Sequence, residues 1–439
     1  MTNQRSMKVV IIGGGFAGLK LARRLNDHID IEVTLIDRNN YHQFQPLFYQ
    51  VATAGLDASN ISFPLRKAFQ GSKNVAVRLA EVKQINTKDN NILTDIGTFD
   101  YDRLIIATGA DTNFFGNEEL KANAFPMKST IEALQLRNRV IQNFEDALLV
   151  KDKDATELQR MMTIVVVGGG PTGVEVSGAL AEMRNNILPK DYPDLDFAKM
   201  NIYLVEGSPR TLNAMSDKSA AQSRKYLEDL GVKVVTKTVV KSYDGTNATL
   251  STGEIIGTRI LIWAAGIQGN VPAGIDSTLI VRGNRIKVDR TNKVQGTENV
   301  YAIGDVAYME TPLYPHGHPQ VANVAINQAK NLAVNLIRQV NGNKHYQDDF
   351  EYHDKGSMAT VGKHKAVVDI PKPRIHFGGW LAWMVWMGLH LVLIVGVKNR
   401  LQIFVNWVYK YFTSDQSLRL LFKISFKPTK AEEATRRLL

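Results

Sequence analysis

The stretch KVVIIGGGFAGLKLARRL, residues 8–25, decides the fold of the first part of this chain. Its opening apolar run is typical of a strand buried on both faces of a parallel sheet, and the residues after the glycines have helical periodicity. A second apolar strand, IEVTLID, follows and ends in an acid. In such a unit the glycines make a tight turn, admit a pyrophosphate and let the helix pack on the strand, while the acid accepts hydrogen bonds from ribose hydroxyls. The residues that we assign to these roles are Gly13, Gly15, Gly18 and Asp37.

The same pattern occurs a second time in TIVVVGGGPTGVEVSGALAEM, residues 163–183, and the next strand ends in Glu206. A single GxGxxG is a weak signal, because a glycine-rich turn without a ligand has the same spacing. Two copies, each in the order strand, glycines, helix, strand and acid, favour two nucleotide sites. The glycines of the second copy are Gly168, Gly170 and Gly173.

Two distant segments complete the first copy, namely YDRLIIATGA, residues 101–110, and VYAIGDVA, residues 300–307. In flavoproteins with two dinucleotide sites, such segments carry the chain into the second domain and back, and the aspartate of the returning segment contacts FAD. We therefore expect FAD at the first copy and NADH at the second. The further contacts that we expect are Thr108, Gly109, Gly304 and Asp305 for FAD, and Ala265 and Gly266 for NADH.

The predicted fold class is α/β, with two Rossmann-like dinucleotide-binding domains and a C-terminal region of amphipathic membrane-anchoring helices. The FAD-binding domain comprises residues 1–115 and 281–345, the NADH-binding domain residues 116–280, and the C-terminal region residues 346–439. In the second domain, Glu206 favours a free 2′-hydroxyl and repels a 2′-phosphate, which favours NADH over NADPH. Arg210, four residues further on, leaves some use of NADPH open.

The composition excludes several kinds of chemistry. The chain of 439 residues contains no cysteine, which removes disulfides, thiolate metal sites and redox-active thiol pairs, and we predict no metal site. The net charge is +10, of which +9 comes from Lys363 onward, where 13 Lys and Arg stand against 4 Asp and Glu. A basic tail on a nearly neutral body indicates an anionic surface as partner. The N-terminus enters a strand at once and offers no signal or transit peptide.

The tail contains FGGWLAWMVWMGLHLVLIVGV, residues 377–397, which has no formal charge. Its glycines limit the expected helix to about 16 residues, or roughly 24 Å, which is short of the roughly 30 Å hydrocarbon core of a bilayer. Trp380, Trp383, Met384, Met387, Leu391 and Ile394 recur at helical spacing, and a second segment, VKNRLQIFVNWVYKYF, follows. Tryptophans interleaved with Lys and Arg are typical of helices in the headgroup region. A buried hairpin or oligomer interface is the alternative, and nucleic acid is not expected as a partner.

The wider pattern carries a resemblance to a known family. NYHQFQPLFYQVATAGL (residues 40–56), GGGPTGVE, LVEGSPRTL, WAAGI, YAIGD and HPQVANVAINQAK occur in this order. Together they resemble the type II NADH dehydrogenases, which are single-subunit NADH:quinone oxidoreductases of bacterial membranes. The resemblance implies a respiratory flavoenzyme that does not pump protons, lies on the cytoplasmic face of the cell membrane as a peripheral protein, and uses FAD, NADH and a quinone. The resemblance does not decide whether the protein forms a homodimer.

Other families share this fold. Disulfide reductases, NADH peroxidases and sulfide:quinone reductases all use cysteine, which this chain lacks. Reductases of ferredoxin and rubredoxin and apoptosis-inducing-factor-like flavoproteins need none, and the ferredoxin-reductase branch ends in a soluble domain instead of apolar helices. Two alternatives therefore stay open, namely a soluble NADH-dependent reductase of an electron-carrier protein and a membrane-bound NADH-sensing flavoprotein with slow turnover.

The resemblance also assigns residues to the reaction. Glu175 follows the second glycine loop, at a position that lies near nicotinamide and flavin in this family. It is predicted to steer NADH or to relay a proton. The alternative is that it is only an acid at a helix N-terminus, which the helix dipole favours. HPQVANVAINQAK, residues 318–330, is expected to form a helix that starts near Pro319 and points at the flavin. On it Gln320, Asn323 and Asn327 share an arc of about 60°, with Gln328 to the side, and face the quinone or neighbouring backbone.

This helix departs from the family pattern AQxAxQxG. Asn323 and Asn327 replace both glutamines, and Ala329 replaces the final glycine. Each asparagine amide retreats by roughly 1–1.5 Å, enough to break a direct hydrogen bond. Either the quinone or backbone lies closer, a water bridges, or quinone affinity is weaker. His316 and His318 stand before the helix, where capping is the expected role.

Overall fold

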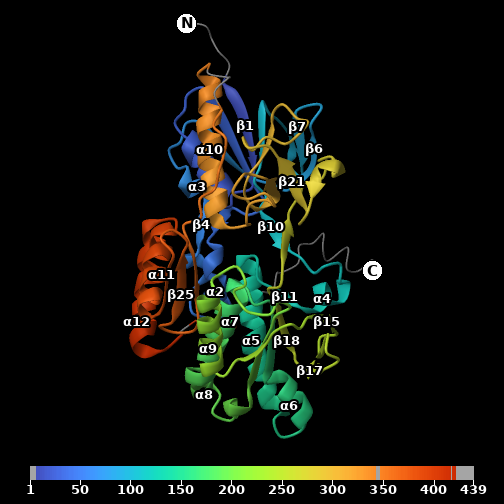
Figure 1. The fold of residues 1–439 in the computed structure, drawn as a ribbon, viewed down its shortest axis with the longest axis vertical. Coiled ribbons are helices and arrows are strands. Elements are labelled where there is room, and N and C mark those ends of the chain that lie inside the picture. The colour runs from blue at the N-terminus through green and yellow to red at the C-terminus, as the bar shows by residue number, and fades with distance from the viewer. Residues whose placement is uncertain (1–5, 343–346, 417, 422–439) are drawn as a thin grey trace, which may run out of the picture.

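The computed structural model describes residues 6–342, 347–416 and 418–421. In the upper half of Figure 1, five parallel strands form a sheet with the order β22-β9-β1-β2-β5. The first strand is the apolar run of the opening stretch, and the last strand in chain order comes from the returning segment. The bounds are β1 Met7–Ile12, β2 Ile31–Asp37, β5 Val75–Leu79, β9 Arg103–Ile106 and β22 Val300–Ala302.

Two helices pack side by side on one face of this sheet. They are α1, Phe16–Leu25, and α10, Ala322–Val340, and their buried side chains form one core with the sheet. The other face is covered by a second core under two small sheets. These consist of β6 Val82–Asn86, β7 Asn91–Thr94 and β8 Gly97–Asp100, and of β20 Ile280–Val281, β21 Arg285–Val288 and β23 Ala307–Met309.

A second five-stranded parallel sheet, with the order β11-β18-β12-β13-β14, lies in the lower half of Figure 1. Its strands are β11 Phe125–Pro126, β12 Thr163–Val167, β13 Asn201–Val205, β14 Lys233–Val235 and β18 Ile260–Trp263. The helices of this half are α4 Glu118–Asn123, α5 Thr130–Val150, α6 Ala155–Met161, α7 Pro171–Asn186, α8 Leu188–Asp191 and α9 Asp217–Asp229. A separate three-stranded antiparallel sheet consists of β15 Val240–Tyr243, β16 Asn247–Leu250 and β17 Ile255–Gly257. The repeat in the sequence therefore corresponds to two Rossmann-like sheets, which confirms that prediction.

The chain passes between the two sheets along a pair of short strands. β10, Ala110–Thr112, leaves the first sheet and pairs antiparallel with β19, Ile267–Gly269, which returns from the second. This crossing lies between the segments that we assigned to the two domains. The domain limits at 115/116 and 280/281 stay predictions, and the limit at 345/346 involves residues outside the described ones.

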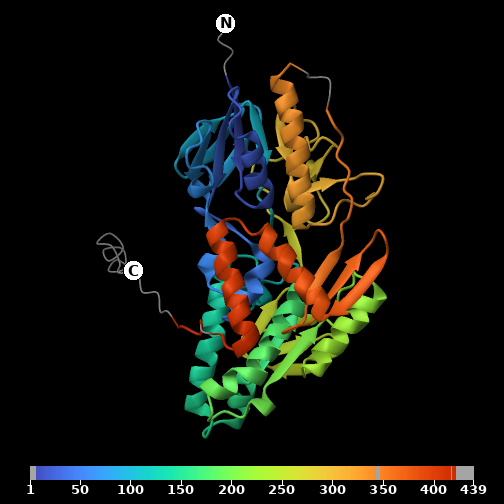
Figure 2. The same cartoon turned by 90° about the vertical axis from the view of Figure 1, so that its left-hand side faces the viewer.

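The C-terminal region forms a compact layer against the second half of the molecule (Figure 2). Three antiparallel strands, β24 Ser357–Thr360, β25 Ala366–Ile370 and β26 Ile375–Gly379, lead into α11, Trp380–Leu393, and α12, Val397–Thr413. Gly379 and Gly396, with φ of 79° and 93°, stand before the two helices and limit the first to 14 residues. Within the described ranges, no helix has the length and apolarity that a membrane crossing requires.

The layer is joined to the nucleotide-binding core through two tryptophans. Trp386 and Trp407 are 2% and 7% exposed, and they belong to the same buried cluster as Ile164 and Val166 of the second sheet. The expectation of headgroup tryptophans is therefore wrong for these two, because β24 packs on α7 and the Trp407 indole donates to Gln50 of α2, Phe48–Ala52. Trp380 is 53% exposed, and its place in the headgroup region stays a prediction.

The start of the carboxamide helix also differs from the prediction. α10 begins at Ala322 with Val321 as its N-cap, so Pro319 and Gln320 precede the helix. Tertiary contacts hold the segment before the helix in a non-helical conformation. The N–H of His318 donates to the Met309 carbonyl, and the Arg285 guanidinium donates to the His318 carbonyl. Of the three amides predicted to share one face of the helix, only Asn323 and Asn327 therefore belong to it, and Gln320 lies before it.

Candidate functional site

The first glycine loop has the geometry of a phosphate-binding turn. Gly13 has φ of 105°, and a Cβ there would lie 2.3 Å from the Ala107 oxygen, while a Cβ on Gly18 would lie 1.8 Å from the Gly13 oxygen. Nothing lies within 4 Å of the Cβ position of Gly15, so the space at the α1 N-terminus is open. Among the described residues, no side chain caps this end of α1, so its N–H groups are free to bind an anion.

The second loop repeats these features. Gly168 has φ of 108°, and its Cβ would lie 2.5 Å from the Ala264 oxygen, while a Cβ on Gly173 would lie 1.8 Å from the Gly168 oxygen. The Cβ position of Gly170 is again open. The α7 N-terminus has no side-chain cap among the described residues, and Pro171 occupies its first turn. Both loops therefore present helix N-termini to open space.

The two acids occupy equivalent positions. Asp37 accepts hydrogen bonds from the N–H groups of Gly14 and Asn39, both at 2.6 Å, and burial raises its pKa. Glu206 accepts from the N–H groups of Gly169 at 2.5 Å and Ser208 at 2.6 Å. Each carboxylate is therefore fixed beside its own glycine loop, where a ribose would lie.

Arg210 is bound to residues other than Glu206. Its guanidinium donates to the side chain and carbonyl of Asn213 and to the Met215 carbonyl, each at 3.2 Å, and pairs with Asp217. These partners occupy the donors that a 2′-phosphate would need. No hydrogen bond or ion pair joins Arg210 to Glu206 among the described residues.

The returning segment is fastened to α10 by carboxamides. The N–H of Gly304 donates to the Gln328 side chain at 2.7 Å, and the Gln320 side chain donates to the Asp305 carbonyl at 2.9 Å. Burial raises the pKa of Asp305, while the positive charges of Lys128 and Arg285 oppose this rise. Gln328, which sequence reasoning set aside, is thus a buried structural link.

The remaining predicted nucleotide contacts lie at the crossing between the sheets. The Thr108 hydroxyl donates to the Asn270 carbonyl at 2.6 Å, and the Gly109 carbonyl accepts from the Asn270 N–H at 3.0 Å. On the other side, the Cα of Ala265 lies 2.7 Å from the Cβ position of Gly168, and the Gly266 carbonyl accepts from the Asn113 N–H at 3.0 Å. The Thr108 nitrogen lies 3.2 Å from the Cβ position of Gly13, so Thr108 and Ala265 each lie beside the glycine loop of their own sheet.

The two asparagines of α10 differ in their contacts. The Asn327 amide donates to the Asn323 carbonyl at 2.9 Å and accepts from Lys330 at 3.3 Å. The Asn323 amide has no partner among the described residues, and its side chain is half-buried. Asn323 is thus the amide that is free to meet a ligand.

Glu175 lies in a buried network that spans three distant segments. Its carboxylate faces the Thr360 N–H at 3.4 Å, and burial raises its pKa to about 8. The Thr360 hydroxyl is 2.9 Å from the Tyr49 hydroxyl, which also accepts from the Gln50 amide at 2.9 Å. Burial therefore favours the protonated form of Glu175, which can act as a proton donor.

Sequence reasoning missed Tyr49, Gln50, Thr360 and Gln328. Tyr49 and Gln50 belong to the stretch NYHQFQPLFYQVATAGL, whose place in the family pattern could have indicated them as site residues. Thr360 is 185 positions from Glu175, and no local pattern indicates it.

The residues fit FAD at the first loop. The open Cβ position of Gly15, the uncapped α1 N-terminus and the fixed Asp37 carboxylate match a pyrophosphate and a ribose. The second loop offers the same donors and acceptor to NADH.

Comparison with known proteins agrees with this geometry. Residues 7–329 match the family model of the pyridine nucleotide-disulphide oxidoreductases, and residues 354–415 match that of the NDH2 C-terminal domain. The chain is 35% identical, over 91% of its length and 86% of the relative's, to the type II NADH:quinone oxidoreductase NdhA of Mycobacterium tuberculosis. It is 30% identical, over 83% and 90%, to the type II NADH:quinone oxidoreductase of Staphylococcus aureus.

Solved structures show the same fold. One of them is the structure of NDH2 from Plasmodium falciparum in complex with NADH, with a TM-score of 0.84 and 22% identity. The match covers 95% of this chain and 100% of the Plasmodium chain. The sulfide:quinone oxidoreductase of Aquifex aeolicus gives a TM-score of 0.66 at 19% identity, with coverage of 93% and 95%. With two glycine loops, a matching C-terminal domain and relatives of at least 30% identity over most of its length, the chain belongs to the type II NADH:quinone oxidoreductases.

Proposed function

We propose that this chain is a flavoenzyme that oxidises NADH and reduces a quinone at a membrane surface, without pumping protons. One observation carries the proposal: the second nucleotide-binding sheet and the C-terminal helix pair share a single hydrophobic core, while the outer face of that pair is apolar. Two nucleotide sites account for hydride transfer from NADH to FAD, and the apolar face accounts for an acceptor dissolved in lipid.

The NADH site is proposed around the second loop. Gly168, Gly170 and Gly173 shape the turn, and the α7 N-terminus favours the pyrophosphate charge. Glu206 would accept from the ribose hydroxyls, and Ala265 and Gly266 lie at the nicotinamide end of the loop. Because the Arg210 donors are already used, the proposed preference is for NADH over NADPH.

The flavin site is proposed around the first loop, Asp37, Thr108, Gly109 and Asp305. When bound, FAD would accept a hydride from NADH and pass two electrons on. The protein binds and orients the nucleotides, since hydride transfer requires the reacting atoms within about 3–3.5 Å of each other. The N-terminal N–H groups of α10 favour negative charge next to them.

The quinone site is proposed at Gln320, Asn323 and Asn327. Amides donate to quinone carbonyl oxygens without adding a charge that would disfavour an apolar ligand. Gln320 is already bound to the Asp305 carbonyl and Asn327 to the Asn323 carbonyl, so Asn323 is the donor that we expect to contact the quinone. Glu175, whose protonated form is favoured by burial, is the proposed donor of a proton.

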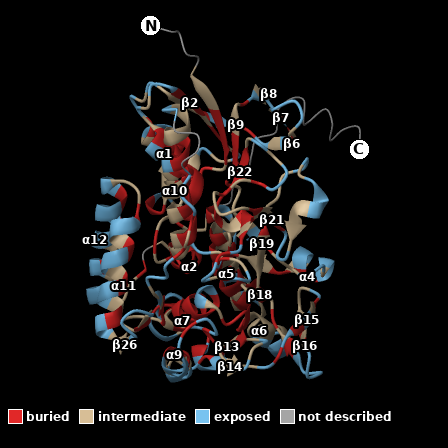
Figure 3. Cartoon of the chain, turned by 45° about the horizontal axis from the view of Figure 1, so that its top comes forward, coloured by how far each residue is buried: buried red, intermediate tan, exposed pale blue. Residues whose placement is uncertain are grey.

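The membrane surface is proposed on the outer face of α11 and α12, which Figure 3 colours largely as exposed. Lys398 and Arg400, both exposed at the start of α12, suit anionic headgroups. Because NADH is a cytoplasmic metabolite, the proposed location is the cytoplasmic face of a bacterial cell membrane. The exposed apolar residues of this face are Leu381, Met384, Val385, Leu389, Val392, Val397, Leu401, Phe404, Val405, Val408 and Phe412.

The alternative is that the outer face of α11 and α12 forms the interface of a homodimer. It would bury the apolar residues of α11 and α12 between two copies and so remove them from lipid. Light scattering in detergent and flotation with liposomes separate the two: a dimer that persists in detergent and does not float would replace the membrane proposal.

Stopped-flow mixing tests the activity itself. The purified protein with FAD should lose flavin absorbance rapidly on mixing with NADH and regain it rapidly with a short-chain quinone. Bleaching without reoxidation would indicate an NADH sensor. Reoxidation by a ferredoxin-type carrier but not by quinone, together with no binding to liposomes, would indicate the soluble reductase.

A further inference from the structure

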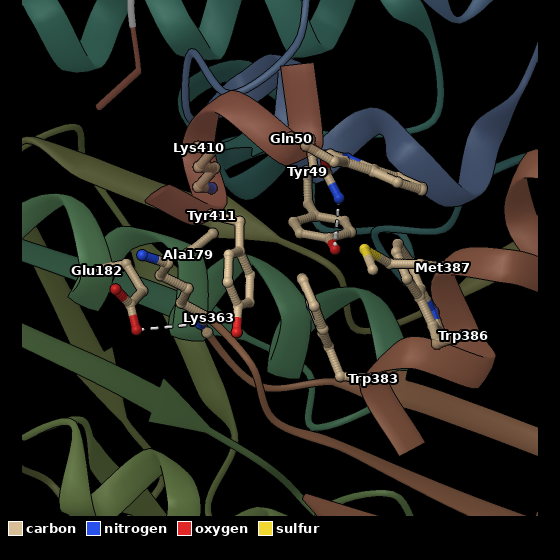
Figure 4. A pocket seen from close by; sticks show the side chains of 12 residues that line it. Tyr49, Gln50, Ala179, Glu182, Lys363, Trp383, Trp386, Met387, Lys410 and Tyr411 are labelled. Carbon is tan, nitrogen blue, oxygen red and sulfur yellow. Dashed lines mark hydrogen bonds between the residues drawn. The ribbon is translucent and has the colours of Figure 1, made fainter. Parts of the chain in front are cut away.

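A narrow cavity lies between α7, α2, the turn from β24 to β25, α11 and α12 (Figure 4). Its empty volume, including its mouth, is about 530 Å³, and the space between the side chains suits a few water molecules and not a quinone ring. The buried end is lined by Tyr49, Gln50, Trp386 and Trp407, and the outer end by Glu182, Lys363, Lys410 and Tyr411.

Lys410 is the central group of the outer end. Although the residue is half-buried over its whole length, loss of solvent around the ammonium group lowers its pKa to about 8. The Gln416 amide bridges it to the protein, 2.9 Å from the Lys410 nitrogen and 2.6 Å from the Thr53 carbonyl. Near neutral pH, Lys410 therefore carries a proton that it can release into the cavity.

Other charged groups face Lys410 from the neighbouring elements. Glu182 of α7 favours its charged form, and Lys363 of the β24–β25 turn disfavours it. Lys363 is held by the Ser414 hydroxyl at 2.7 Å, and its N–H donates to Glu182 at 3.0 Å. His364, next to Lys363, has a pKa lowered by burial first and by the charges of Lys363 and Lys410 as well.

The buried end of the cavity leads to Glu175. Tyr49 lines it, and the Glu175 charge lies close enough to Tyr49 to raise the pKa of its hydroxyl, after the larger effect of burial. The Tyr49 hydroxyl also lies 2.9 Å from the Thr360 hydroxyl, and the backbone N–H of Thr360 donates to the Glu175 carboxylate at 3.4 Å and holds it in place. The Trp407 indole donates to Gln50 at 2.8 Å, and the Gln50 amide donates to the Tyr49 hydroxyl at 2.9 Å, so the tyrosine oxygen accepts one hydrogen bond and can still donate its own proton. A hydroxyl held in this way passes a proton on when it receives one.

The proposed reaction consumes one proton from water in each turnover. NADH supplies a hydride, which is two electrons and one proton, whereas quinol formation needs two electrons and two protons. The balance is NADH + H⁺ + quinone → NAD⁺ + quinol. The second proton must therefore reach a site from which lipid and packed side chains exclude bulk water.

We propose that Lys410 is a proton-relay residue, which transfers a solvent proton through the water of this cavity to Tyr49 and onward to Glu175. Its ammonium gives up a proton toward Tyr49 and takes another from solvent at the mouth, beside Glu182 and Lys363. The proposal rests on quinone reduction as the reaction, and Lys410 acts on it at a distance, through Glu175.

The test separates the two halves of the reaction in the Lys410→Met holoenzyme. Steady-state turnover with a soluble quinone in detergent should fall at least tenfold at pH 7, while flavin bleaching by NADH and turnover with ferricyanide, an acceptor that takes electrons without protons, should stay within twofold. Wild-type quinone turnover should decline above about pH 8, where both Lys410 and Glu175 lose their protons. The Lys410→Met variant should be slow already below that pH. Lys410→His should restore part of the rate, with its decline shifted toward the histidine pKa of about 6.5.

The matched control is Lys190→Met, which removes an exposed lysine on α8 and should leave every rate unchanged. Unchanged quinone turnover and pH profile in Lys410→Met would overturn the relay. Equal loss of the NADH and ferricyanide reactions would overturn it too, because it would show a structural role. Failure of the wild type to reduce quinone at all would instead refute the proposed function.

Discussion

The side-chain oxygen of Gln328 lies 2.7 Å from the backbone nitrogen of Gly304 and accepts its hydrogen bond. Gln328 is 1% exposed, so water cannot replace this bond. It joins α10 to the turn that carries Asp305, and the Gln320 amide adds a second link to the same turn. The position of the proposed flavin contact therefore depends on a residue 24 positions further along the chain.

Replacement of Gln328 by methionine should therefore weaken FAD retention. The variant keeps the volume but leaves the Gly304 N–H buried without an acceptor, which costs about 1–3 kcal/mol. We expect a lower melting temperature and a lower ratio of FAD to protein after gel filtration. Gln295→Met, at an exposed loop position, is the control, and equal FAD content in both variants would contradict the argument.

Glu206→Gln should relax the choice of nucleotide. The amide can still accept from the Gly169 N–H but no longer repels a 2′-phosphate, so the ratio of kcat/KM for NADH over NADPH should fall about tenfold, or about 1.4 kcal/mol. Arg210→Met should leave that ratio unchanged, because Arg210 is bound to Asn213, Met215 and Asp217. A higher KM for NADPH in the arginine variant would mean that Arg210 contacts the nucleotide.

Asn323→Gln should change quinone affinity without changing that for NADH. The longer side chain extends the free amide by about 1–1.5 Å, which is enough to make or break a direct hydrogen bond. Asn327→Gln should add little, since the Asn327 amide is bound to the Asn323 carbonyl. Steady-state kinetics with menaquinone and ubiquinone analogues measure both constants. A changed KM for NADH would show that this helix lies at the other substrate.

Glu175 should make stability depend on pH. Burial raises its pKa from 4.5 to about 8, so the folded protein binds this proton more tightly than the unfolded chain does. The stabilisation is complete below about pH 4.5 and is lost as pH rises toward 8, with a total on the order of a few kcal/mol. Melting temperatures of Glu175→Gln should therefore fall less than those of the wild type between pH 5 and 8. Parallel curves for the two proteins would argue against a buried, protonated Glu175.

The double variant Leu401→Glu/Val405→Glu should release the protein from membranes. These side chains are 62% and 55% exposed on one face of α12, and burying each in lipid contributes about 1.5–3 kcal/mol. Binding to anionic vesicles should fall more than tenfold, with quinone turnover in detergent unchanged. Lys190→Glu changes the net charge equally and should still bind. Full vesicle binding by the double variant would place the membrane surface elsewhere.

The repeated glycine loops show how far sequence reasoning extends. The residues of each strand–glycine–helix unit are local in the chain, so spacing alone indicated Gly13, Gly168 and the two acids, and the structure places each acid beside its loop. The carboxamide helix shows the limit. Periodicity indicated a helix, but contacts of His318 with residues from other elements decided that it begins at Ala322.

The sequence by itself determined two Rossmann-like units, their order, the absence of thiol chemistry and the apolar C-terminal pair, because these properties depend on composition and local spacing. Only the tertiary structure decided which polar groups meet: Gln328 with Gly304, Thr360 with Glu175, and Lys410 with the cavity that leads to Tyr49. It also turned Trp386 and Trp407 inward. The physical reason is that long-range packing sets burial, and burial determines both the partners and the pKa values of these groups.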